Sequence, residues 1–247
     1  MLRAQSADRL RLEGLKEERR PVIGGGLSVL RAVFELLQID RMQVAQGALR
    51  QGALYDLLDR EQPTTDLRTS TVRSLMQRFA VDEAQAERVA QVACALFAQA
   101  SHGDHAHALR KLGWAARLHE IGCRISHSES HRHGAYILDN TDVAGFSQPE
   151  LHRLGMLVLG HKGKVRKLET DLDDATFALQ LLCLRLAVVL CHARRDPDTH
   201  ALALHANTGL GTFELSVSAD WAERYPQSAH LLREEVLAWQ KTPWTLA

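Results

Sequence analysis

Cysteine is scarce in this chain, and none of its four cysteines, Cys94, Cys123, Cys183 and Cys191, belongs to a CxxC pair. A secreted disulfide framework needs paired cysteines at short spacings, so we expect reduced thiols and a cytoplasmic protein. The first residues alternate charged and apolar side chains without the continuous apolar run of a secretory signal. We therefore expect no export.

Long apolar runs and a surplus of one charge are missing as well. The most hydrophobic segment, Phe177–Ala193, is about one turn short of the roughly 20 residues that cross a bilayer, and it contains Arg185 and His192. We expect a buried helix and no membrane span. Acidic and basic residues number 30 each, so no overall field favours DNA, and an anion site requires a local cluster of cations.

The N-terminal part of the chain contains three consecutive glycines. Gly24–Gly26 lie between Pro21–Ile23, which resembles a short strand or loop, and a helical pattern at Leu27–Leu37. The pattern predicts a glycine turn, either an ordinary one or one that an anion approaches closely. A polar segment at 59–66 that contains a proline and lacks apolar periodicity predicts a domain boundary.

The remaining sequence changes its periodicity once. Residues 67–195 have a helical pattern almost throughout, with Asp82 as an expected N-cap and Asp171–Asp174 as an acidic cap of the following helix. After 195 the pattern predicts a small unit of two strands and one helix, at Ala201–His205, Phe213–Val217 and Ser228–Gln240.

Four histidines lie within fifteen residues, at His119, His127, His131 and His133. Histidine titrates near neutral pH, and its neutral ring binds metals. The cluster is therefore a metal site, a phosphate site or a coincidence of composition.

Several motifs occur in order along the chain and together resemble one family. They are Glu18-Arg19-Arg20-Pro21-Val22-Ile23, Gly47-Ala48-Leu49-Arg50-Gln51-Gly52, Leu118-His119-Glu120-Ile121-Gly122, Ser126-His127 and His131-Arg132-His133-Gly134-Ala135-Tyr136-Ile137-Leu138. Gly145-Phe146-Ser147 and His161 with its basic neighbours fit the same pattern. The chain resembles the C-terminal half of the exopolyphosphatase/guanosine pentaphosphate phosphohydrolase (Ppx/GppA) family.

The resemblance implies a mainly α fold in three parts. These are a remnant of the second actin-like (ribonuclease H-like) domain at 1–60, an HD-like helical domain at 61–195 and a small C-terminal α+β unit at 196–247. In the family, a pair of actin-like domains hydrolyses phosphoanhydrides with a divalent cation, Mg or Mn. The resemblance implies that this catalytic part is absent here and that the chain itself needs no cofactor.

The HD-like domain is a second candidate for catalysis. HD phosphohydrolases hold their metals with histidines and aspartates, but Gln85 stands where a first-helix histidine is expected and Val188 where a closing aspartate is expected. Three alternatives stay open: a catalytic metal site, a metal site without turnover and a scaffold without metal. The candidate catalytic residues are His119 and Glu120, and the candidate metal ligands are His119, Glu120, His131 or His133, and His161.

Basic residues near the histidines suggest a track for a polyanion, because phosphate chains are bound by series of Lys and Arg. The alternative is a solvated lysine loop beside histidines buried in the core. The candidate polyphosphate-binding residues are Arg132, His133, His161, Lys162, Lys164, Arg166 and Lys167.

The leading expectation is a C-terminal region that binds polyphosphate or guanosine pentaphosphate and supports a homodimer, while hydrolysis resides in the absent domain. A separate chain that carries this domain is a further expected partner. The alternative is a stand-alone metal-dependent HD-type phosphohydrolase that acts on a nucleotide or phosphoanhydride. A third class is a regulatory partner of a full-length homologue. No Walker loop, GxSxG motif or Cys-His nucleophile pair indicates another chemistry.

Overall fold

The computed structural model describes residues 15–42, 67–101, 103, 105–168 and 170–247. It divides the chain into two compact units, 1–54 and 55–247, which are described separately. The described residues are mainly helical with one small sheet, so the expected fold class is confirmed at that level. The boundaries at 60 and 195 remain predictions. Within the described part of the chain, no helix is both long and apolar enough to span a membrane.

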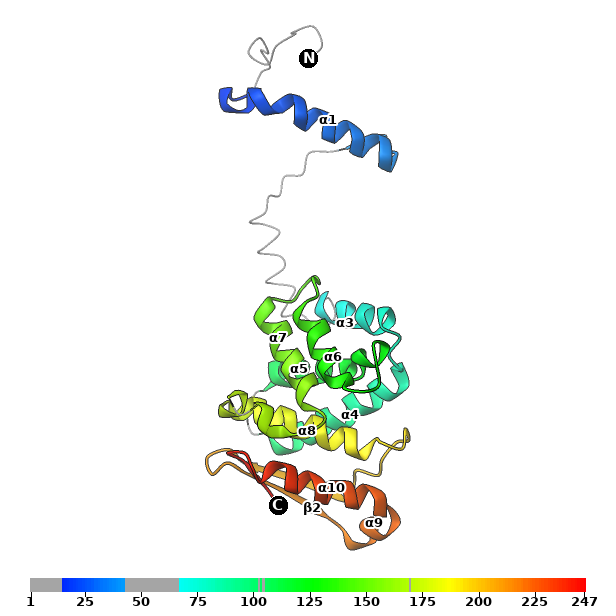
Figure 1. Ribbon diagram of the computed structural model, residues 1–247, viewed down its shortest axis with the longest axis vertical. Coiled ribbons are helices and arrows are strands. Elements are labelled where there is room, and N and C mark those ends of the chain that lie inside the picture. The colour runs from blue at the N-terminus through cyan, green and yellow to red at the C-terminus, as the bar shows by residue number, and fades with distance from the viewer. Residues whose placement is uncertain (1–14, 43–66, 102, 104, 169) are drawn as a thin grey trace. The chain divides into compact units, whose positions relative to one another are not determined.

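The first unit contains one long helix, α1 (Arg20–Leu37), which follows the short 3-10 helix η3 (Glu17–Arg19). α1 runs through Gly24–Gly26 without interruption, so the predictions of a glycine turn and of a strand before it are wrong (Figure 1). Pro21 lies in the first turn, where its fixed φ and missing N–H suit a helix start. The helix therefore begins before the glycines instead of after them.

The second unit is a body of helices arranged around α8 (Figure 1). α8 is apolar on nearly every side, and it contacts α4, α5, α7 and α10. A helix that is apolar all round belongs in a core, and the most hydrophobic segment of the sequence is indeed this buried helix. The bounds are α3 Leu67–Arg78, α4 Glu83–Ala100, α5 Ala106–Leu118, η4 Ile121–Arg124, α6 Ser130–Asp139, α7 Gln148–Gly160, η5 Val165–Leu168, η6 Asp171–Asp173 and α8 Ala175–Leu190.

Two predicted helix starts are confirmed by their hydrogen bonds. The Asp82 carboxylate accepts from the backbone N–H of Gln85 at the start of α4, and Asp174 accepts from Thr176 and Phe177 at the start of α8. Such caps satisfy N–H groups that the helix itself leaves unpaired. The acidic segment before α8 is therefore a cap, as the sequence indicated.

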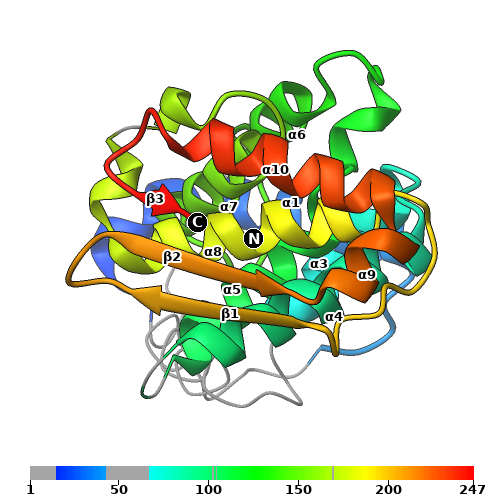
Figure 2. The same ribbon diagram turned by 90° about the horizontal axis from the view of Figure 1, so that it is seen from below.

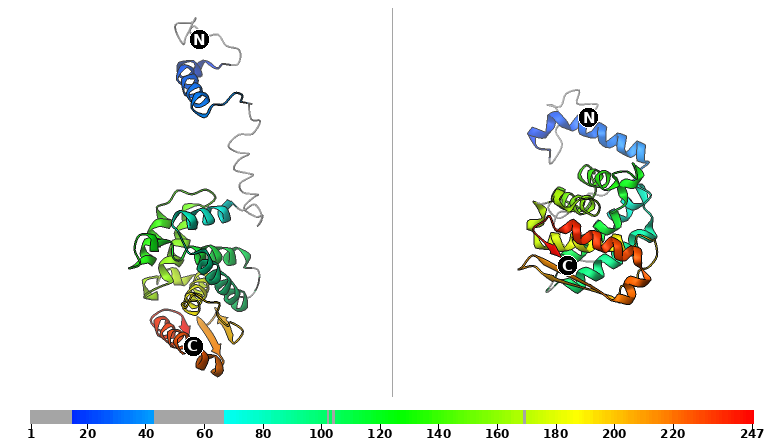
Figure 3. Two further views of the ribbon diagram at one scale, coloured as in Figure 1. Left: turned by 90° about the vertical axis from the view of Figure 1, so that its right-hand side faces the viewer. Right: turned by 60° about the horizontal axis from the view of Figure 1, so that its bottom comes forward.

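The C-terminal residues form a layer against the helical body (Figures 1 and 2). β1 (Leu202–Asn207) and β2 (Thr212–Val217) pair antiparallel, with α9 (Ala219–Arg224) and α10 (Pro226–Trp239) following. The expected strands and final helix are thus confirmed. β1 lies along α4 and α10 along α8, and two further views show the same layer beneath the helices (Figure 3).

A third strand, β3 (Thr245–Leu246), pairs parallel with β2 and was not predicted. Two residues are too few to show a periodicity. The strand is held instead by the stacking of Trp244 on Phe213, whose ring centroids lie 4.8 Å apart. The chain end is therefore fixed by tertiary contacts that a local pattern does not reveal.

One buried ion pair joins this layer to the core. Arg185 on α8 and Glu235 on α10 are 6% and 5% exposed, and the Arg185 Nη2 donates to Glu235 Oε2 at 2.8 Å. The Arg185 Nη1 donates to the carbonyl oxygens of Gly160 and Gly163 at 2.6 and 3.0 Å. Trp239 Nε1 also donates to Glu235. Every charged atom of the pair therefore has a partner, as a buried charge requires.

Replacing Glu235 with alanine is expected to lower the free energy of unfolding by about 3–5 kcal/mol, because Arg185 would remain buried without its counter-charge. Urea unfolding of the full chain measures this change. The matched control is Glu234→Ala, which removes an exposed carboxylate one residue earlier and should change stability by less than about 0.5 kcal/mol. Equal effects of both substitutions would contradict the importance of the pair.

Candidate functional site

The structure brings three of the predicted histidines together. His119 follows the end of α5, His131 lies in the first turn of α6 and His161 follows the end of α7. The ring centroid of His161 lies 5.4 Å from that of His119 and 6.4 Å from that of His131. All three side chains are buried. The convergence of residues distant in sequence therefore agrees with the prediction of a histidine cluster.

Close backbone approach makes this convergence possible. A side chain on Gly122 would collide with the Ser130 carbonyl and the Gly134 backbone N. Glycine at 122 therefore lets η4 pack directly against α6, which delivers His131 to the cluster.

Hydrogen bonds fix how two of these rings are protonated. His119 Nδ1 lies 2.6 Å from the Ala116 carbonyl oxygen, and His161 Nδ1 lies 2.6 Å from that of Val158. Each Nδ1 therefore carries the proton and donates it, and the neutral ring leaves Nε2 as an acceptor. Burial lowers the pKa of His119 and of His131, and it lowers the pKa of His161 further below the ordinary value. The cluster is neutral at neutral pH.

The carboxylate of Glu120, next in sequence to His119, forms an ion pair with an arginine. Arg194 donates to Glu120 Oε1 at 2.8 Å and to Asp82 Oδ2 at 2.7 Å, in the wall of a cavity of about 290 Å³. Gln85 donates to the Cys191 carbonyl oxygen, and its own amide oxygen accepts from Arg88. Glu120 is therefore neutralised by a side chain of the protein.

The described residues do not fit a catalytic cation. Among residues 15–42, 67–101, 103, 105–168 and 170–247, no three histidine, cysteine, aspartate or glutamate side chains are placed to hold a metal ion. Val188 packs against the hydrophobic core where the aspartate of an HD-type site is expected. We therefore assign no step to a metal at His119, Glu120, His131 and His161.

The predicted basic track is divided by the structure. Arg132 is exposed and forms an ion pair with Glu129 at 2.8 Å. His133 lies two residues after His131 on α6, and residues at that spacing point to different faces of a helix. Arg132 and His133 therefore do not extend the histidine cluster.

A compact group of cations remains in the segment after α7. Lys162, Lys164, Arg166 and Lys167 are exposed, and the structure pairs none of them with a carboxylate of a described residue. Lys167 Nζ donates to the Lys162 carbonyl oxygen at 2.8 Å, which closes the segment into a loop. We call residues 161–167 the basic loop. Partial burial of its ammonium group lowers the pKa of Lys167 to about 8, and Arg185 and Arg132 add to this effect.

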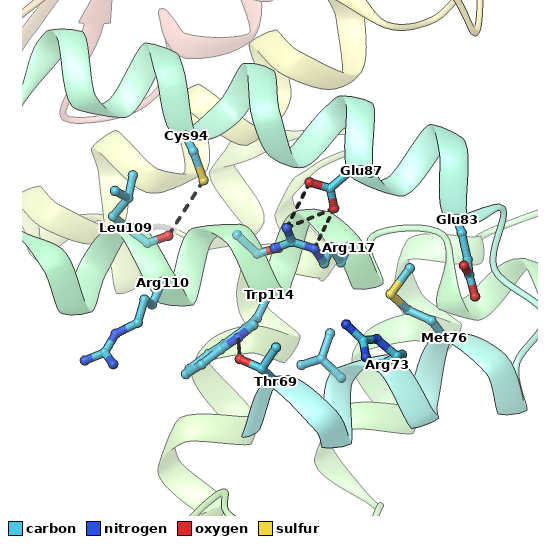
Figure 4. Close-up of a pocket in the computed structure, with 12 residues that line it drawn as sticks. Thr69, Arg73, Met76, Glu83, Glu87, Cys94, Leu109, Arg110, Trp114 and Arg117 are labelled. Atoms are coloured by element: carbon cyan, nitrogen blue, oxygen red, sulfur yellow. Dashed lines mark hydrogen bonds and ion pairs between the residues drawn. The ribbon is translucent and has the colours of Figure 1, made fainter. Parts of the chain in front are cut away.

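A larger cavity lies elsewhere, between α3, α4 and α5 (Figure 4). Its volume is about 600 Å³, and Trp114, Met76 and Cys94 line it together with an ion pair of Glu87 and Arg117. The size suits a small molecule, but none of the predicted site residues lines this cavity.

Two arginines that control the site were missed from the sequence. The sequence around Arg185 could have indicated its role, because an arginine inside a wholly apolar helix must have a buried partner. No sequence pattern indicated the role of Arg194, since its partners Glu120 and Asp82 lie far away in the sequence.

Comparison with known proteins places the chain in a family. Residues 67–236 match the family model described as Ppx/GppA phosphatase, domain III, and residues 1–61 match the model of the Ppx/GppA phosphatase family. The chain belongs to the Ppx/GppA phosphatase family. The sequence resemblance is thus confirmed.

Curated relatives align with almost the whole chain. Each is named a guanosine-5'-triphosphate,3'-diphosphate pyrophosphatase. The protein from Pseudoalteromonas translucida is 35% identical over 96% of this chain and 48% of its own length. Those from Vibrio atlanticus and Vibrio campbellii are 36% and 34% identical over 92% and 99% of the chain, and over 46% and 50% of their own lengths. The chain spans about half the length of the curated relatives that it matches.

The comparisons correct the leading expectation about function. A chain that only binds polyphosphate and supports dimerisation, with hydrolysis in an absent domain, is contradicted by the match of residues 1–61 to the phosphatase family model. The pyrophosphatases also align with nearly all of the chain. The expectation that the catalytic part is absent from this chain is therefore wrong.

Lowering the pH from about 7.5 to about 5.5 is expected to destabilise the protein. Because the folded protein lowers the pKa of His119, His131 and His161, the unfolded chain binds more protons as the pH falls through about 6.5, the ordinary histidine value. The stabilisation is thus complete above that pH and is lost below it. Urea unfolding midpoints at the two pH values measure the loss.

The variant His161→Gln should reduce this pH dependence, whereas the control His205→Gln, which changes an exposed histidine on β1, should not. An unchanged pH dependence in His161→Gln would show that the cluster does not carry the effect.

Proposed function

We propose that this chain acts in the hydrolysis of a phosphoanhydride bond of guanosine 5'-triphosphate 3'-diphosphate. The observation that carries the proposal is the alignment of proteins named for that pyrophosphatase activity with 92–99% of the chain. Membership of the Ppx/GppA phosphatase family supports the same reaction class.

In this proposal the basic loop contacts the phosphates of the substrate. A guanosine pentaphosphate carries two groups of phosphates, and clustered Lys and Arg bind such chains through charge. Lys162, Lys164, Arg166 and Lys167 are exposed and have no carboxylate partner among the described residues, so they are available for this contact. His161 supports the loop from inside and does not touch the substrate.

A divalent cation, Mg or Mn, would assist hydrolysis in the family by neutralising phosphate charge. The described histidines and carboxylates do not form a site for it, so we assign no residue to that cation. Polyphosphate is the alternative substrate of this proposal. Homodimerisation, a cytoplasmic location and the HD-like and actin-like assignments remain predictions.

The purified chain with Mg or Mn is expected to release phosphate from guanosine 5'-triphosphate 3'-diphosphate. Replacing Lys162 and Lys167 together with methionine should raise KM by about threefold or more, since two phosphate contacts are lost. The control Lys241→Met removes an exposed lysine outside the basic loop and should leave KM unchanged. Absence of phosphate release with either metal would overturn the proposed reaction.

A further inference from the structure

We propose that the cavity between α3, α4 and α5 is a binding site for an aromatic α-amino acid. Arg73 holds the carboxylate of the ligand, Glu83 holds its ammonium group, and the aromatic side chain occupies the apolar interior. No residue of the basic loop lines this cavity. The site therefore does not depend on the proposed hydrolysis.

The first observation is the size and lining of the cavity. Its volume is about 600 Å³, and Val72, Met76, Leu109 and Trp114 supply an apolar wall. Small-molecule sites have this size and this lining, with a few polar groups that fix the orientation of the ligand. The interior therefore suits a ligand with a large apolar body.

Two sulfur atoms favour an aromatic ring as that body. Met76 and Cys94 both line the cavity (Figure 4), and sulfur makes favourable contacts with aromatic ring edges. Burial raises the pKa of the Cys94 thiol, so this group is uncharged at neutral pH. The thiol thus belongs to the apolar part of the wall.

The ion pair in the wall is complete without a ligand. Arg117 Nε and Nη2 donate to the two carboxylate oxygens of Glu87 at 2.9 and 3.1 Å, and Arg117 Nη1 donates to the Gly113 carbonyl oxygen at 3.2 Å. A further cation of the lining, Arg110, donates to His107 Nδ1 at 2.9 Å. These groups are already engaged within the protein.

Two opposite charges of the lining remain without a partner. Arg73 lies on α3 and Glu83 begins α4, and both side chains are exposed. Within the part of the chain that the structure describes, neither side chain forms an ion pair or a hydrogen bond. Figure 4 shows both near Met76, at the same end of the cavity. One cation and one anion are therefore available to a ligand at this end.

A zwitterion matches these two charges better than an ion of one sign. A carboxylate pairs with the planar guanidinium of Arg73 through two parallel hydrogen bonds, and an ammonium group donates to Glu83. An organic acid would bring a second negative charge towards Glu83, and an amine would bring a second positive charge towards Arg73. An α-amino acid carries both charges beside its side chain.

Calorimetric titration of the full chain with L-tryptophan tests the site. The matched ligands are indole-3-propanoate, which lacks the ammonium group, and tryptamine, which lacks the carboxylate. We expect a Kd of about 1 mM or tighter for L-tryptophan and binding about fivefold weaker or more for each analogue. A shift of the Trp114 indole N–H resonance during the titration places the ligand in the cavity.

Two variants assign the charges. Arg73→Met should weaken L-tryptophan binding by about fivefold or more and should remove most of its advantage over tryptamine. Glu83→Gln should do the same for its advantage over indole-3-propanoate, because each substitution removes the partner of one ligand group. The matched control Arg78→Met removes an exposed arginine of α3 outside the cavity, and it should change the Kd by less than about twofold. All three substitutions change exposed side chains, and thermal melting checks that each variant is folded.

Three results would overturn the site. These are no L-tryptophan binding at about ten times the expected Kd, equal losses in Arg73→Met and Arg78→Met, and indole-3-propanoate binding as tight as that of L-tryptophan. The last result would mean a site for organic acids instead of amino acids. Phosphate release from guanosine pentaphosphate is a separate measurement, so the proposed reaction and this site can fail independently.

Discussion

A single buried guanidinium, that of Arg185, connects the core, the C-terminal layer and the basic loop. A charge in the interior is tolerated only when its partners are complete, and Arg185 finds them in Glu235 and in the carbonyls of Gly160 and Gly163. The requirement determines where α10 lies and how the chain leaves α7. The surface cations of the loop therefore depend on an interaction that is itself inaccessible to a ligand.

A second arginine neutralises the carboxylate beside the histidine cluster. Arg194 supplies to Glu120 and Asp82 the positive charge that a metal ion would provide. Arg194 has φ 54, an unusual backbone conformation for a non-glycine residue. Such strain persists only where surrounding contacts enforce it. The neutral imidazoles of His119 and His161 are then stabilised by backbone carbonyls.

The sequence allowed prediction where the determinants are local, and it failed where they are not. Asp82 and Asp174 as caps, the strands of the C-terminal layer and the buried α8 follow from short patterns. The three glycines at Gly24–Gly26 led to the wrong prediction of a turn. A helix that starts at Pro21 can run through glycines at a modest cost in stability. The family resemblance offered His119, His131 and His161 only as one possible ligand set. The bond from Arg194 to Glu120 gave no sequence signal, because it requires the fold to bring distant residues together.

The central claim is that Arg185 shapes the basic loop from inside, and amide hydrogen exchange of residues 161–167 tests it most directly. In a double variant, Arg185→Met with Glu235→Leu, apolar side chains fill the space of the ion pair, so global stability should fall by less than in Glu235→Ala. The account predicts faster exchange in the loop while the exchange of the α8 amides is retained. Unchanged exchange in residues 161–167 would contradict it.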